Sequence, residues 1–406
     1  MMNPAIQGAR DTALALLDAS PGDLDHGLEL HADAVVCDSY GFSPVSAVDG
    51  QALAQAAEEG ASDIELLDMS EDMRMTRHVT DEREREEYMA AWQASGVTCI
   101  TQNAGEEGQS PLRLMKRLAR FTYVTDMMPQ FVSKAATPDD IVAAKQEGKR
   151  CLWFTGNGVP LVQDWVSVQD ELRYIRVFYQ LGIRMMHLTY NRRNMIGDGC
   201  AEPANAGLSD FGRAVIAQMN KVGVIVDCAH SGWQTSLEAA QASQSPMVAS
   251  HSACADLNPH HRCKPDEVIR AICDTGGYIG ICCVPAFLGG SGDINALLDH
   301  IDHVVNTFGA DHVAIGTDTT YSSSRSAEES ARLTPRKQRK RWANFWQPND
   351  PLHDPKWRQE HMARSLAWTN WPLFTVGMVQ RGHSDESIRK ILGGNVLRVA
   401  RAVTAS

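Results

Sequence analysis

Residues 222–231 read Val-Gly-Val-Ile-Val-Asp-Cys-Ala-His-Ser, a β-branched apolar run that ends in an acid and a histidine. Short runs of this kind between stretches of helical character are typical of buried parallel strands. Eight of them occur along the chain, at Ala34–Asp38, Gly96–Thr101, Arg150–Thr155, Arg184–Tyr190, Val222–Cys228, Pro246–His251, Gly277–Val284 and His312–Asp318. Eight strand–helix alternations are the count of a (β/α)8 barrel, and no GxGxxG motif follows the first run. We therefore predict an α/β protein with one (β/α)8 TIM barrel domain over residues 1–406.

Helix signals lie between the predicted strands. Ser209 is a suitable N-cap for a helix over Asp210–Asn220. Pro265 suits the first position of a helix over Pro265–Cys273, whose first turn carries two acids. These helices fill the intervals that the alternation requires.

Two segments fall outside the repeat and are predicted insertions, at about residues 39–80 and 320–370. The second contains a basic run over 336–341, followed by Trp342, Phe345, Trp346, Trp357, Trp368 and Trp371. In an acidic protein this combination favours a loop over the barrel mouth or a subunit contact. We expect a homodimer, with residues 342–371 as a candidate contact.

The composition excludes several classes of protein. The 38 Lys and Arg residues against 50 Asp and Glu residues give a net charge of −12, which argues against a nucleic-acid partner. No apolar stretch is long enough for a membrane helix, and no secretory signal is visible. The ten cysteines have no CxxC spacing and several lie in apolar runs, so we expect buried free thiols and a cytoplasmic location.

Three of the predicted strands end in residues that bind metals. His230 follows the fifth strand, His251 ends the sixth and Asp318 ends the eighth. The C-terminal ends of barrel strands converge on one face, where active sites of such barrels lie. Two imidazoles with a carboxylate are a common ligand set for zinc, which can activate a water molecule.

Several blocks of sequence resemble the renal (membrane) dipeptidase family from about residue 130 to the C-terminus. They are Gly207–Gly212, Met219–Ser231, Ser250–Ala253, Arg262–Val268, Ala314–Asp318 and Ile391–Val399. The resemblance implies a metallo-dependent hydrolase barrel that cleaves dipeptides and related amides with a two-metal centre, usually of zinc. By motif, it places His230 and His251 on the histidine ligands of one metal, Arg262 on the arginine that binds the substrate carboxylate, and Asp318 on the acid of strand eight.

Other family positions are occupied by different residues. Tyr40 and Phe42 stand where the first strand of the family carries two ligands of the other metal, and Thr155 stands where a Glu bridges both metals. Tyr190 replaces a histidine that touches the substrate. We expect Tyr40 and Thr155 to contact the substrate and Tyr190 to take part in catalysis. His187 is not expected to substitute, because strand alternation points it to the other face from Tyr190.

Two arrangements of the site stay open. One is a single metal, held by His230, His251 and either Asp318 or Asp38. The other is a metal-free pocket in which Arg262 binds an anionic group and the histidines do acid–base work.

Three functions follow from these alternatives. The first is a dipeptidase-like hydrolase of a small amide with a free carboxylate, using at most one zinc ion. The second is a lyase or isomerase that acts on an aromatic or other small acid through His, Tyr and Asp. The third is a catalytically silent binding protein, since a barrel hosts many chemistries.

Overall fold

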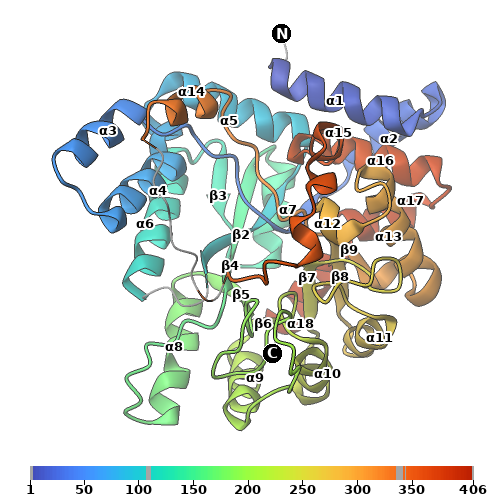
Figure 1. The fold of residues 1–406 in the computed structure, drawn as a ribbon. Coiled ribbons are helices and arrows are strands. Elements are labelled where there is room, and N and C mark those ends of the chain that lie inside the picture. Colours follow the sequence, from blue (N-terminus) through green and yellow to red (C-terminus); the bar gives the residue numbers. More distant parts are fainter. Residues whose placement is uncertain (1–2, 107–110, 335–341, 343, 405–406) are drawn as a thin grey trace.

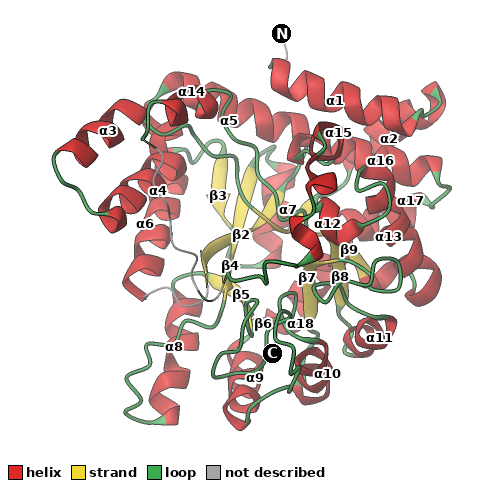
Figure 2. Ribbon diagram, in the orientation of Figure 1, coloured by secondary structure: helices red, strands yellow, loops and turns green. Residues whose placement is uncertain are grey.

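The strands of the computed structural model form one parallel sheet that curves into a barrel, with helices around it (Figure 2). The structure describes residues 3–106, 111–334, 342 and 344–404, so the basic run over 336–341 lies outside the described residues. In the described part the strands are β1 (Cys37–Gly41), β2 (Cys99–Glu106), β3 (Val132–Lys134), β4 (Arg150–Asn157), β5 (Ile183–His187), β6 (Ile225–Asp227), β7 (Val248–Ser252), β8 (Tyr278–Ile281) and β9 (Val313–Ile315). Their order is β1-β2-β4-β5-β6-β7-β8-β9, which confirms the predicted (β/α)8 barrel.

The helices alternate with the strands and cover the outside of the barrel (Figure 1). In the first half of the chain they are α1 (Pro4–Leu17), α2 (Pro21–Asp33), α3 (Gly50–Glu58), α4 (Asp63–Thr80), α5 (Glu82–Ser95), α6 (Pro111–Met127), α7 (Pro138–Gln146) and α8 (Val168–Gln180). In the second half they are α9 (Asp210–Val222), α10 (Trp233–Ala242), α11 (Asp266–Asp274), α12 (Pro285–Leu288), α13 (Ile294–Phe308), α14 (Ser326–Ala331), α15 (Glu360–Ser365), α16 (Trp371–Gln380), α17 (Asp385–Arg389) and α18 (Asn395–Thr404). Within the described ranges, no helix has the length and apolar character needed to cross a lipid bilayer.

Some boundaries differ from the sequence prediction. β3 was not predicted, because three residues are too few to show a pattern; it pairs with the first half of β4. β6 begins at Ile225 rather than Val222, because α9 runs through Val222 and ends on Gly223, whose φ of 87° suits glycine. The predicted N-cap Ser209 accepts a hydrogen bond from the Gly212 amide, whereas Pro265 caps α11 instead of starting it.

The barrel closes where the chain leaves β9 and meets the end of β1. The Asp318 amide donates to the Tyr40 carbonyl at 3.0 Å. Beside this contact the buried Asp38 carboxylate accepts from the Thr317 amide at 2.9 Å, the Thr317 hydroxyl at 2.6 Å and the Trp368 indole at 3.1 Å. Burial raises the pKa of Asp38 to about 7, against these hydrogen bonds. The Asp38 carboxylate therefore helps to hold the barrel closed in this structure.

The interior of the barrel is packed with alternate strand residues. Cys37, Cys99 and Cys151 stand in register on β1, β2 and β4, and their side chains belong to the interior cluster with Met185 and Tyr278. All ten cysteines are free and nine are buried, as expected from the sequence. The apolar face of α18 joins the same cluster, so this helix covers one end of the barrel interior.

The two predicted insertions have different structures. The first carries α3 and α4, and α4 is tied to α6 through Glu71, which pairs with Arg117 and Arg120. The second carries α14, α15 and the 3-10 helices Pro351–His353 and Pro355–Arg358. Trp368 and Trp371 at its end are buried, with exposed fractions of 1% and 0%, so they are core residues and cannot form the subunit contact suggested for 342–371.

The burial of His31 lets us predict how the stability of the fold depends on pH. His31 of α2 places Nε2 2.8 Å from the Ser95 carbonyl and Nδ1 2.8 Å from the Thr375 hydroxyl, so the neutral ring has both nitrogens paired. Burial lowers the pKa of His31 to about 4. Because the unfolded chain takes up this proton near pH 6.5, the stability from His31 is present above that pH and is lost as the pH falls towards 4.

We expect this group to lower the free energy of unfolding by about 2 kcal/mol between pH 7 and pH 5. Urea unfolding at the two pH values checks this, with His31→Gln as the comparison, since a glutamine can pair with the same two groups without titrating. An equal pH dependence in both proteins would contradict the assignment.

Candidate active site

Two histidines meet at the C-terminal end of the barrel, as the strand ends predicted. His230 lies just after β6 and His251 lies on β7, and both are buried. Their Nε2 atoms are 3.0 Å apart. Burial lowers the pKa of both rings well below the usual value, and the Arg262 guanidinium adds to this shift. Both imidazoles are therefore neutral at physiological pH.

The hydrogen bonds behind the two rings decide which nitrogen of each carries the proton. The Ser250 hydroxyl donates to the Asp227 carboxylate, so its oxygen accepts from Nδ1 of His251, 2.8 Å away. Nδ1 of His230 donates to Oδ1 of Asn191 at 2.8 Å. Each Nε2 is then left with a lone pair, and the two lone pairs face one another. Such a pair is stabilised by a cation that both nitrogens can bind, and histidine ligands are commonly held in this way through their other nitrogen.

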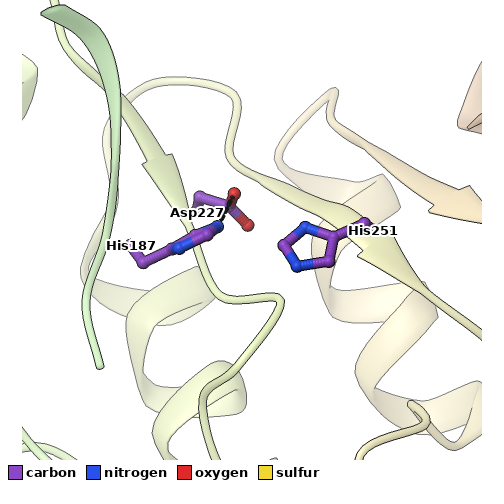
Figure 3. A group of neighbouring side chains, drawn as sticks. All are labelled: His187, Asp227 and His251. Atoms are coloured by element: carbon purple, nitrogen blue, oxygen red, sulfur yellow. Dashed lines mark ion pairs between the residues drawn. The ribbon is translucent and has the colours of Figure 1, made fainter. Parts of the chain in front are cut away.

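His187 also belongs to this group, contrary to the sequence prediction. Its Nε2 lies 2.5 Å from the Asp227 carboxylate, and Figure 3 shows the two side chains side by side with the His251 ring facing them. Donor atoms of His187, Asp227 and His251 all lie within 4.8 Å of one another. The prediction from strand alternation was wrong because β5 ends at His187. The chain turns before Tyr190, so the two side chains need not point to opposite faces. Asp227, which was not predicted as a site residue, is the carboxylate at the end of β6.

The charge state of Asp227 follows from its partners. Burial by itself raises the pKa of this carboxyl, but His187 and the hydrogen bonds from Ser250 outweigh it, and the pKa is lowered. An ionised Asp227 holds His187 on one side and, through Ser250, His251 on the other. The Asp227 carboxylate thereby orients the His251 ring, whose Nε2 carries one of the two facing lone pairs.

Tyr40 occupies the space beside His251. Its ring stacks on the His251 ring with centroids 3.8 Å apart, and its hydroxyl donates to Oδ1 of Asn157 at 2.6 Å. Phe42 packs edge-on against Tyr40, with ring centroids 5.8 Å apart. The Thr155 hydroxyl donates to the Met185 carbonyl at 3.0 Å. Tyr40 and Thr155 are both fully buried, and their contact with a substrate stays a prediction.

Tyr190 lies over the other histidine. Its half-buried ring stacks on His230 with centroids 4.0 Å apart. Gly199 lets the following loop approach, since a Cβ there would come within 2.3 Å of the Tyr190 carbonyl oxygen. The two histidines are thus enclosed between Tyr40 and Tyr190. The predicted catalytic role of Tyr190 is not tested by this packing.

Arg262 lies beneath the histidines and is only 1% exposed. Its Nη1 donates to the Ala229 carbonyl at 2.7 Å and its Nη2 to the His251 carbonyl at 2.8 Å, while Nε has no hydrogen-bond partner among the described residues. The guanidinium therefore joins the backbone next to His230 to the backbone of His251. Binding of a substrate carboxylate by Arg262 stays a prediction, and in this structure the unpaired Nε–H is buried.

Asp318 lies at the closure of the barrel, where part of the residue is exposed but its carboxyl group is buried. Its φ of 55° is in the left-handed region, which is rare for residues other than glycine and is tolerated best by Asp and Asn. Burial raises the pKa of Asp318 to about 6, although the Arg262 guanidinium and the nearby His187 oppose this shift. A carboxyl with this pKa can exchange a proton near neutral pH.

A second group of side chains lies at the mouth of the barrel. Asp350 lies 3.0 Å from Nε2 of His260 and 3.2 Å from Nε2 of His261, two histidines to which the sequence analysis assigned no role. The pKa of Asp350 is strongly lowered, because hydrogen bonds from both rings outweigh its burial. A cavity of about 490 Å³ lies beside this group, and its lining includes Glu202, Trp233, His261, Gln347, Asn349 and Asp350.

The tautomer of His260 argues against a metal in this second group. Nδ1 of His260 accepts the backbone N–H of Arg262 at 3.1 Å, so the ring proton is on Nε2 and points to Asp350. A metal on Nε2 would move the proton to Nδ1, against the Arg262 N–H. The group at the mouth is therefore a hydrogen-bonded cluster, whereas His230 and His251 present free lone pairs.

The family model for membrane dipeptidase (peptidase family M19) matches residues 29–329, which is most of the chain. The chain belongs to the membrane dipeptidase family. It is therefore a member of a family of metal-dependent hydrolases, as the motif blocks and the strand-end histidines indicated.

Curated relatives agree with this membership. The chain is 26% identical over 285 residues to Dipeptidase tcpJ of Claviceps purpurea (strain 20.1), a match that covers 69% of this chain and 57% of that protein. It is 28% identical over 232 residues to Dipeptidase verJ of Clonostachys rogersoniana, covering 56% and 50%. The match thus spans about half the length of these relatives.

Solved structures share the fold of this family member. An amidohydrolase from Pseudomonas aeruginosa has a TM-score of 0.65 and 24% identity, with 94% of this chain and 99% of that chain covered. The probable dipeptidase PvdM from the same organism has a TM-score of 0.66 and 18% identity, with 95% and 100% covered. These similarities extend over the whole barrel.

Proposed function

We propose that this protein hydrolyses a dipeptide or a similar small amide with a free carboxylate, using a single metal ion held by His230 and His251. The observation that carries the proposal is the pair of Nε2 lone pairs 3.0 Å apart, each on a ring whose Nδ1 is held from behind. Zinc binds imidazole nitrogen at about 2.0 Å, so one ion can reach both atoms. The dipeptidase names of the curated relatives support this reaction class.

A single metal is favoured by what surrounds the two histidines. Where the family resemblance implies ligands of another metal, the Tyr40 ring stacks on His251 and the Thr155 hydroxyl is donated to a backbone carbonyl. A phenol ring and a hydroxyl engaged in this way offer no strong ligand to zinc. We therefore propose one metal per chain at this site.

The metal, when bound, would act as a Lewis acid and lower the pKa of a bound water. Residues of the chain would orient the ligands, move a proton and bind the substrate. Asn191 and Ser250 keep the two imidazoles in the tautomer that binds metal, and Asp318 moves a proton at its carboxyl. Arg262, whose buried Nε–H has no partner among the described residues, would bind the substrate carboxylate. The rings of Tyr40 and Tyr190 enclose the histidines and keep water from their faces.

Metal analysis and an activity panel test the proposal together. We expect about one equivalent of zinc per purified chain and release of amino acids from members of a dipeptide panel. Two equivalents would overturn the single-metal assignment. Absence of both metal and hydrolysis would overturn the proposed reaction and favour a metal-free enzyme or a binding protein on the same barrel.

Asp318→Asn tests the proposed proton transfer. We expect kcat to fall about 100-fold, because the amide cannot exchange a proton, with bound zinc unchanged. In the wild-type protein kcat/KM should rise with pH through about 6, where the Asp318 carboxyl ionises, and the variant should lack this limb. Asp311→Asn is the matched control, because Asp311 is an exposed acid in the 3-10 helix just before β9. A variant with the wild-type pH profile would remove Asp318 from the reaction.

A further inference from the structure

The segment over residues 344–353, here called the strap, crosses in front of the strand ends after the chain has left β9 (Figure 1). The strap supplies Gln347, Asn349 and Asp350 to the wall of the mouth cavity. Two buried contacts connect it to the loops that follow β5 and β7. Each of these contacts is linked, through a short series of covalent and hydrogen bonds, to the site histidines His230 and His251.

The first contact uses Arg192, which is 3% exposed. Its Nε donates to the Phe345 carbonyl of the strap at 3.0 Å, and its guanidinium packs on the Phe345 ring at 5.0 Å. The preceding residue, Asn191, accepts the Nδ1–H of His230. This end of the strap is thus one residue from the group that orients His230.

The second contact uses Asp350, whose side chain is 3% exposed. Asp350 accepts from Nε2 of His260, and Nδ1 of the same ring accepts the backbone N–H of Arg262. The Arg262 guanidinium in turn donates to the carbonyls of Ala229 and His251. Hydrogen bonds on either side of Arg262, which its own side chain links covalently, therefore connect the strap to the Ala229 and His251 carbonyls.

We propose that Asp350 is a positioning residue that links the strap to the placement of His230 and His251 through His260 and Arg262. A neutral His260 can serve both partners only in the tautomer with the proton on Nε2, and the Asp350 carboxylate selects this tautomer. The His261 ring on the other carboxylate oxygen holds Asp350 in place. Without the Asp350 carboxylate, the His260 ring would lose its acceptor and would no longer be held in place against the Arg262 backbone N–H.

Hydrogen exchange of the folded protein tests the coupling without reference to catalysis. In Asp350→Asn we expect faster exchange in peptides of the strap and also in peptides over 226–232 and 249–263, which contain the site histidines and Arg262. Asp354→Asn, which removes an exposed carboxylate just beyond the strap, should leave all of these peptides unchanged. Faster exchange confined to the strap, or no change at all, would overturn the coupling.

His260→Gln tests the same chain from its other end and covers the case in which Asp350→Asn does not fold. This variant leaves the contact between Asp350 and His261 in place. We expect it to raise exchange in 249–263 as strongly as Asp350→Asn does, with a smaller effect on the strap. Unchanged exchange in 249–263 would overturn the role of His260.

Zinc affinity provides the readout that a purely structural role would not move, and this part rests on the proposed function. We expect calorimetry with zinc alone to give a dissociation constant about tenfold higher for Asp350→Asn than for the wild type or Asp354→Asn. Equal affinities would overturn the positioning role. If the wild-type chain binds no zinc, the proposed function fails, while the exchange experiment still decides the coupling.

Discussion

His230→Ala is expected to abolish zinc binding and to lower kcat/KM at least 1,000-fold, on the order of several kcal/mol of transition-state stabilisation. The physical reason is that the two facing Nε2 atoms are 3.0 Å apart, and the ion needs both of them. His251→Ala should have the same effect. Metal content after dialysis and the initial rate on an active dipeptide measure the two results.

The control for this prediction is His26→Ala. His26 is an exposed histidine of α2 that pairs with Asp385, so its loss removes an imidazole from the surface and not from the barrel. We expect unchanged zinc content and activity. If His230→Ala keeps one equivalent of zinc and its activity, the metal is bound elsewhere in the chain and the proposed site is wrong.

Gly280→Ala is expected to destabilise the fold by about 3 kcal/mol. Gly280 lies in β8, where a Cβ would come within 1.9 Å of the Ser250 carbonyl oxygen on β7. Because that contact is with backbone, it cannot be relieved by a side-chain rotation. Ser250 also holds His251 and Asp227, so the same displacement should weaken zinc binding. Urea unfolding measures the first effect and zinc titration the second.

Gly8→Ala in α1 is the opposite case. Nothing lies within 4 Å of a Cβ at Gly8, which is inside a helix, so alanine should stabilise the protein by up to about 1 kcal/mol. Comparing the two variants separates the effect of a steric clash with neighbouring backbone from the effect of adding a methyl group. A Gly280→Ala protein as stable as the wild type would show that the two strands can separate at no cost.

The sequence predicted the barrel and the two central histidines because both are encoded locally. Each strand is a short apolar run, and the end of a run marks the catalytic face of a parallel barrel. His230 and His251 could therefore be placed from their position alone. The same reasoning failed for His187, since alternation applies only while the chain is extended and β5 ends at this residue.

Other parts of the site depend on residues that are distant in the sequence. Asp350 is 90 residues from His260, and no local pattern marks either of them as a partner of the other. The tautomers of His230 and His251 likewise depend on Asn191 and Ser250, whose side chains have no distinctive spacing. Only the folded chain brings these groups together.

The apolar periodicity and the sequence motifs thus determined the fold class and the family, and they predicted where the candidate site lies. The tertiary structure decided which imidazole nitrogens are free, what occupies the space beside them and how the strap reaches them. The physical reason is that burial and periodicity are properties of neighbouring residues, whereas proton placement depends on hydrogen-bond partners that the closed barrel brings within about 3 Å.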